Sequence, residues 1–222
     1  MKFKRFLAIA AATLSLAAQA SVNYGDNLIS NGGAESGTTG WTAFDGYDLF
    51  QSVSYGSNWV LPTQPGPVDR GAKMFTGVGA QSAGFQVIDV SSLTANGTAV
   101  EYSLSGWLGG WQSQGDNALL YVSFLDITGN EIGSAAIGPV LPADRGNQTG
   151  LFFQQSLGTL PVGVSKIQFS LSMERLGGGD NDGYADNLSF VLTSPVPEAD
   201  SLAYALAGLG VVGMMARLRR RG

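Results

Sequence analysis

The sequence contains neither cysteine nor histidine among its 222 residues. Without these two residue types the chain cannot form a disulfide, a thiolate zinc site, a Ser-His-Asp triad or a Cys-His dyad. The motifs G-x-S-x-G and H-E-x-x-H and the phosphate-binding P-loop are absent as well. The enzyme classes that these motifs and residues would reveal are therefore excluded.

Positive charge is scarce over most of the chain. Between positions 21 and 194 lie five of the twelve Lys and Arg residues and fifteen of the seventeen Asp and Glu residues. This stretch carries a formal charge of −10, five minus fifteen, whereas the whole chain carries −5. A surface this acidic repels nucleic acid and attracts cations, so no nucleic-acid partner is expected.

Residues 1–20 have the pattern of a secretory signal peptide. They begin with basic residues, continue with a short apolar core and end in the small residues of Ala18-Gln19-Ala20. This order predicts cleavage after Ala20 and export through the inner membrane. A retained N-terminal membrane helix is the weaker alternative, because the apolar core is short for a membrane span.

Residues 194–222 predict a tail with three parts. A proline-containing motif at 195–200 comes first, an uncharged transmembrane segment at 201–216 follows, and a basic end occupies 217–222. As a helix the uncharged segment would measure about 24 Å, which is marginal for a bilayer core of roughly 30 Å. Arginines would stop transfer and stay in the cytoplasm, leaving the acidic domain outside. These are Arg217, Arg219, Arg220 and Arg221.

The uncharged segment contains GLGVVG at 208–213, which matches the dinucleotide-binding pattern G-x-G-x-x-G. That pattern is informative only where a strand of a βαβ unit precedes it, and no such strand is expected here. Glycine is common in membrane helices, where it permits close helix packing. We therefore interpret the match as part of the membrane segment.

The motif Val196-Pro197-Glu198, the apolar stretch containing LAGLG and the arginine cluster together resemble the PEP-CTERM sorting signal. This signal occurs in Gram-negative bacteria that make exopolysaccharide. The resemblance implies two partners, an exosortase-type enzyme that recognises and cleaves the tail and the inner membrane that holds it before cleavage. Ala199 stands in place of the second proline of the name-giving motif. A plain anchor that is never cleaved is the alternative.

Several runs between 21 and 193 alternate apolar and polar residues with a period of two, as half-buried strands do. These runs lie at 84–90, 100–106, 118–127, 166–174 and 187–192. Glycine-containing turns are expected at 94–98 and 128–131, and no long amphipathic helix is expected. The pattern predicts an all-β domain, an antiparallel β-sandwich of jelly-roll type with about eight to ten strands.

The two ends of this domain carry the stretches NLISNGGAESGTTGW at 27–41 and GGGDNDGYADNLSFVL at 177–192. They resemble the opening and closing strands of galactose-binding-like modules, which include many carbohydrate-binding domains. The resemblance implies that both ends lie side by side and share a structural calcium ion, with Glu35 and Asp186 as ligands. Asp182 is a further candidate, because Ca²⁺ accepts several carboxylate oxygens. A solvated acidic turn without an ion is the alternative.

Three tryptophans are candidates for sugar binding, since aromatic faces stack on pyranose rings. Trp107 and Trp111 lie in a glycine-rich and amide-rich stretch at 106–117, which is typical of surfaces that bind neutral polysaccharide. Trp59 is the third candidate. Ordinary packing in the core is the alternative for each of them, as it is for Trp41.

The sequence therefore predicts an exported, non-catalytic protein of the envelope or extracellular matrix, with carbohydrate or exopolysaccharide as its expected ligand. Three alternatives stay open. The first is a plain membrane-anchored surface protein, and the second is an ice-binding protein with a flat face rich in threonine. The third is a glycoside hydrolase that uses a pair of carboxylates, a chemistry that needs no histidine.

Overall fold

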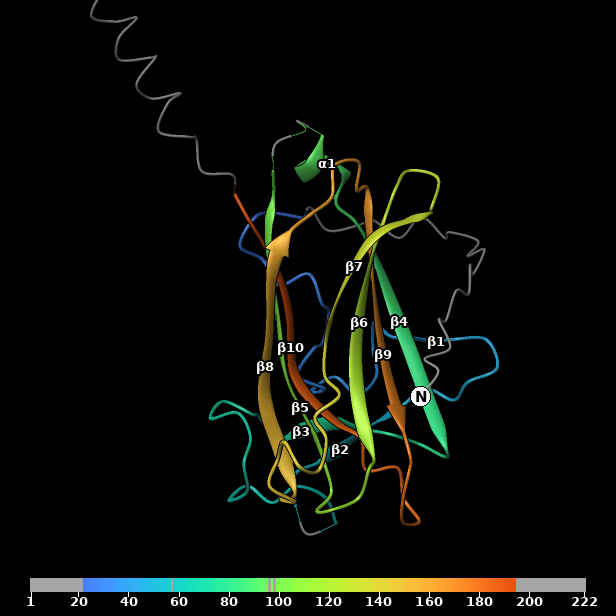
Figure 1. Ribbon diagram of the computed structural model, residues 1–222, viewed down its shortest axis with the longest axis vertical. Helices are drawn as coiled ribbons and strands as arrows, with labels where there is room; N and C mark the ends of the chain where they lie inside the picture. Colours follow the sequence, from blue (N-terminus) through green and yellow to red (C-terminus); the bar gives the residue numbers. More distant parts are fainter. Residues whose placement is uncertain (1–21, 57, 96, 98, 195–222) are drawn as a thin grey trace, which may run out of the picture.

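The computed structural model describes residues 22–56, 58–95, 97 and 99–194. Two antiparallel sheets of five strands each pack face to face, with their long strands along the long axis of the molecule (Figure 1). The first sheet contains, in spatial order, β1 (Thr42–Ala43), β4 (Gln81–Asp89), β9 (Lys166–Glu174), β6 (Asn117–Leu125) and β7 (Glu131–Ile137). The second contains β2 (Gln51–Ser54), β3 (Lys73–Thr76), β10 (Tyr184–Thr193), β5 (Glu101–Gly110) and β8 (Gly150–Thr159). The predicted antiparallel β-sandwich is confirmed.

The alternation in β9 places its apolar residues between the sheets, as predicted. Ile167, Phe169, Leu171 and Met173 are each no more than 1% exposed. Phe169 meets Phe190 of β10 across the core, and Tyr102 of β5 stacks on Phe190 at a centroid distance of 5.3 Å. These contacts join the middle strands of the two sheets into one core.

Alternation does not predict β8 or the short strands β2 and β3. In β8 the consecutive apolar residues Leu151, Phe152 and Phe153 hide the period of two, because side chains on both faces are apolar. The expected turn at 94–98 falls partly outside the described residues, and Ser91–Thr94 forms the short helix α1. No helix in the described ranges is long and apolar enough to cross a bilayer.

The two terminal motifs lie side by side, which confirms that expectation. The N–H of Leu28 donates to the carbonyl of Phe190 at 2.8 Å, and the N–H of Leu188 donates to the carbonyl of Gly32 at 3.1 Å. The opening motif differs from a regular strand, since after Asn27 it forms a series of turns. A Cβ atom on Gly32 would overlap the carbonyl oxygen of Leu188, so this close approach requires glycine.

The predicted signal peptide, the sorting motif, the transmembrane segment and the basic end lie outside the described residues. The last strand, β10, ends at Thr193, so the predicted tail begins directly after the sandwich.

Candidate functional site

The second sheet presents an outward-facing surface built from β10, β5 and β8. Even-numbered residues of β5 such as Leu104 and Leu108 are fully buried, so the odd-numbered residues of β5 point away from the core. Strand register then aligns Ser189, Ser105 and Gln155 in one row across the sheet. We call this surface the outer face. It consists of Glu101, Ser103, Ser105, Trp107, Phe153, Gln155, Leu157, Thr159, Ser189, Val191 and Thr193.

Aromatic and polar groups lie next to one another on the outer face. The half-buried ring of Trp107 meets the ring of Phe153 edge-on at a centroid distance of 5.7 Å. Phe153 is 51% exposed and Leu157 is 68% exposed. Beside them the side-chain amide of Gln155 donates to the hydroxyl of Ser103 at 3.2 Å. Exposed apolar side chains beside hydroxyl and amide groups suit a sugar ring, which has both apolar faces and hydroxyl edges.

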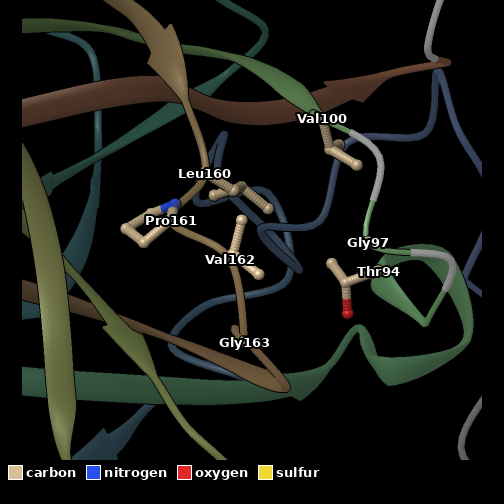
Figure 2. Close-up of a pocket in the computed structure, with 7 residues that line it drawn as sticks. All are labelled: Thr94, Gly97, Val100, Leu160, Pro161, Val162 and Gly163. Atoms are coloured by element: carbon tan, nitrogen blue, oxygen red, sulfur yellow. The ribbon is translucent and has the colours of Figure 1, made fainter.

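The outer face contains a depression of about 270 Å³ near the end of β8. This volume approaches the lower limit of small-ligand pockets, roughly 300 Å³. The residues around it are Glu101, Tyr102, Ser103, Leu157, Gly158, Thr159 and Thr193. A second cavity lies at the same end of the sandwich, where the turn at 160–163 faces Thr94 and Val100 (Figure 2). Its volume of about 20 Å³ has room for little more than one water molecule.

The three predicted sugar-binding tryptophans lie together at one end of the outer face. Trp59, Trp107 and Trp111 pack, partly buried, against one small apolar cluster. The buried members of that cluster are Val60, Met74, Leu151 and Tyr184. Trp41, in contrast, is 6% exposed and packs edge-on against Phe50 in the main core. The core alternative therefore holds for Trp41.

Asp186 lies fully buried on β10, directly opposite Trp107 in the strand register. Its Oδ2 accepts a hydrogen bond from the hydroxyl of Tyr55 at 2.5 Å, and its Oδ1 accepts one from the N–H of Asn187 at 2.8 Å. Burial raises the pKa of Asp186 to about 7, and these two hydrogen bonds offset the effect only in part. The negative charge of nearby Glu35 raises this pKa further.

Glu35 lies two residues after Gly33, where an added Cβ atom would be 3.8 Å from Oδ1 of Asp186. One of the carboxylate oxygens of Glu35, Oε1, accepts hydrogen bonds from the N–H groups of Ala72 and Lys73 at 2.8 and 2.9 Å. These bonds tie the opening motif to the start of β3. The exposed carboxyl of Asp69 lies in the same region, where it accepts a hydrogen bond from the side-chain amide of Asn187 at 3.0 Å.

Asp182 does not join this pair, so the three predicted metal ligands do not form one group. It precedes Asp186 by four residues, which in extended chain corresponds to about 13 Å. Its Oδ1 accepts a hydrogen bond from the hydroxyl of Tyr184 at 2.7 Å, and its own N–H donates to Asp116 at 3.0 Å. Burial raises the pKa of Asp182. In the part of the chain that the structure describes, no group of three or more acidic side chains is placed to hold a metal ion.

Sequence reasoning misses the buried groups that hold the loops beside the tryptophans. Arg145 is 2% exposed, and its guanidinium donates to four backbone carbonyls at 2.5 to 3.3 Å. These are the carbonyls of Trp111, Gln112, Gln114 and Val140. Asp116 accepts hydrogen bonds from the N–H groups of Leu176 and Gly177, each at 2.7 Å. Neither residue lies in a recognisable motif, so no sequence signal marks them.

Residues 195–221 match the family model described as the PEP-CTERM protein-sorting motif. The chain carries this sorting motif. It begins two residues after the end of β10, and its place agrees with the predicted tail. A search of curated protein sequences finds no match to the chain.

Solved structures resemble the sandwich itself. The enzymatically active domain of tailspike protein 4 from bacteriophage CBA120 is 17% identical with a TM-score of 0.52, and the match covers 75% of this chain and 21% of that one. This chain thus spans about a fifth of the tailspike chain. The CBM22-1 xylan-binding domain of Paenibacillus barcinonensis Xyn10C is 17% identical with a TM-score of 0.45. The match covers 79% of this chain and 100% of that one. At these identities the likeness concerns the fold alone.

Proposed function

We propose that this protein is exported, carried to the cell envelope or extracellular matrix by its PEP-CTERM motif, and binds carbohydrate without catalysis. The observation that carries the proposal is the outer face, where the exposed ring of Phe153 and the half-buried ring of Trp107 lie beside hydroxyl and amide groups. The sorting motif supports the location, because exosortase-type processing at the inner membrane would leave the sandwich outside the cytoplasm.

A neutral polysaccharide is the ligand class that the charges favour. Glu101 is the one charged residue of the outer face as defined above. Two arginines of the sandwich are engaged by the backbone, since Arg70 donates to the carbonyls of Pro67 and Gln64, and Arg145 donates to backbone carbonyls as well. Few positive charges are thus free to pair with an anionic sugar.

A binding role also agrees with the state of the buried acids. A glycosidase needs two carboxyl groups that face the substrate from opposite sides. Asp116, Asp182 and Asp186 are instead buried and accept hydrogen bonds from protein donors. This arrangement supports structural roles for these carboxyl groups.

Truncating the aromatic side chains of the outer face should weaken carbohydrate binding. We expect the full-length chain to bind neutral polysaccharides in affinity gel electrophoresis, and Phe153→Ala to weaken binding by about tenfold, since one stacked ring is lost. Trp107→Ala should weaken it at least as much. The matched control is Tyr121→Ala, which removes a half-buried aromatic ring from β6 in the other sheet and should bind as the parent protein does. Retention of binding by Trp107→Ala, or binding to anionic polysaccharides alone, would contradict the proposal.

We also propose a structural calcium ion held by Glu35 and Asp186. The two carboxyl groups come from the opposite ends of the domain and interact electrostatically. Asp186 already accepts two hydrogen bonds, so an ion would take its remaining lone pairs, the free oxygen of Glu35 and nearby carbonyl groups. When bound, calcium supplies positive charge that favours the ionised form of Asp186.

Calcium should therefore stabilise the protein against heat. We expect added calcium to raise the melting temperature of the full-length chain and a chelator to lower it, because the ion binds the folded state only. Glu35→Gln and Asp186→Asn should each remove this response. Asp126→Asn, which changes an acid in the turn between β6 and β7, is the control that should keep it. Equal melting temperatures of the parent protein with calcium and with chelator would exclude the ion.

A further inference from the structure

β8 is an edge strand without the features that protect edges from pairing with another chain. It has ten residues, none of them charged and none of them proline. Natural edge strands are commonly short, charged, bulged or interrupted by proline. The other edges fit this rule: β1 has two residues, β2 has four, and β7 carries Glu131 next to an irregularity in its pairing with β6.

The open side of β8 presents backbone groups that can pair. The N–H of Leu160 donates to the carbonyl of Val100, toward β5, whereas the N–H of Leu151 donates to Pro65, away from β5. In an antiparallel ladder this direction alternates, so odd-numbered residues 153 to 157 direct both N–H and C=O to the open side. Within the described ranges, the one hydrogen bond formed by these outward groups comes from the side chain of Gln154 to the carbonyl of Phe153.

We propose that β8 pairs antiparallel with β8 of a second copy of this chain, around a two-fold axis at Gln155. In this register Gln155 faces Gln155 of the second copy, and Phe153 faces Leu157 of the second copy. Each of these residue pairs exchanges both of its backbone hydrogen bonds, because all of the groups involved point to the open side. At Leu151 the N–H already donates to the carbonyl of Pro65, so the ladder between the two copies ends before this residue.

The strand is complementary to itself in this register. Two-fold pairing brings each residue against its symmetry mate, so a charged strand would place like charges opposite each other. Here an amide meets an amide, and the exposed side chain of Phe153 meets the exposed side chain of Leu157. The apolar pairs lose water-exposed surface on association, which stabilises the dimer.

The dimer would join the second sheets of two copies into one continuous sheet, with five strands from each copy. The two outer faces would then lie next to each other on the same side. A long polysaccharide could contact both, so its avidity would exceed that of one face. The pairing itself does not depend on carbohydrate binding.

Cysteine cross-linking tests the register directly, because the chain has no cysteine of its own. Full-length Gln155→Cys, oxidised in the cells that express it, should form a covalent dimer. The matched control is Ser134→Cys, an exposed residue on β7 at the edge of the other sheet, which should stay monomeric. A dimer that forms equally well from Ser134→Cys, or no dimer from Gln155→Cys, would overturn the proposal.

Sedimentation velocity of the full-length chain measures how tightly the two copies associate in the dimer. Gln155→Pro removes one outward N–H per copy and leaves the groups that face β5 in place, so the dimer should dissociate at least about tenfold more readily. Gln155→Lys, which places two like charges opposite each other, should weaken the dimer in the same way. It provides the test if the proline variant does not fold. A parent protein that stays monomeric at high micromolar concentration, or variants that dimerise as it does, would overturn the proposal.

Discussion

Replacing Arg145 with methionine is expected to lower the melting temperature of the protein by roughly 10 °C. The guanidinium of Arg145 donates to four backbone carbonyls in a buried site, and methionine donates to none of them. With a net value of about 1 kcal/mol for each hydrogen bond, the loss is about 4 kcal/mol. Thermal unfolding followed by circular dichroism measures it.

The matched control is Arg175→Met. Arg175 is less buried, and its guanidinium donates to one carbonyl, that of Gly179. We expect this variant to unfold within about 3 °C of the parent protein. Arg145→Met that unfolds at the same temperature as Arg175→Met would show that the four carbonyls find other donors, water among them.

Replacing Asp186 with asparagine is expected to stabilise the protein at pH 8 in the presence of a chelator. Its pKa is about 7 in the folded protein, against an ordinary value of 3.8. The folded state therefore binds this proton more tightly than the unfolded state. The contribution of the Asp186 carboxyl group to stability is fully present below about pH 4 and is lost as the pH rises toward 7. Above pH 7 the difference approaches roughly 4 kcal/mol. Asparagine is neutral at every pH and avoids this loss.

Melting temperatures of the parent protein and of Asp186→Asn, compared between pH 4 and pH 8, measure the effect. The two curves should converge at low pH and separate steadily above it. Asp69→Asn, which changes an exposed acid in the same region, should follow the parent curve. Parallel curves for the parent protein and Asp186→Asn would show that burial does not perturb this carboxyl group.

The strands that sequence alone predicts are those in which one face is apolar and the other polar. In β9 every second residue is buried, so its position and inward face follow from alternation. In β8 apolar residues occupy both faces, because Phe152 packs on the core and Phe153 points to solvent on the outer face. Alternation therefore fails on the strand that carries both part of the proposed sugar-binding surface and the open edge.

The candidate site was predictable only in part for a related reason. Trp59, Trp107 and Trp111 could be selected by residue type, and the structure brings them together around Tyr184. Phe153 could not be selected, since only its pairing with Trp107 across β5 and β8 gives it a role. Whether these rings bind sugar stays a prediction.

The sequence by itself determined the sorting motif, because a short linear signal is read by another protein and needs no folded context. It also determined the sandwich, since alternation is local, and it excluded the chemistry of cysteine and histidine. The tertiary structure alone decided that the opening motif reaches Asp186, that the carboxylate of Asp182 accepts from Tyr184 instead, and that β8 is an edge. These are contacts between segments far apart in the chain, and their partners are set by strand order and register, which no local pattern encodes.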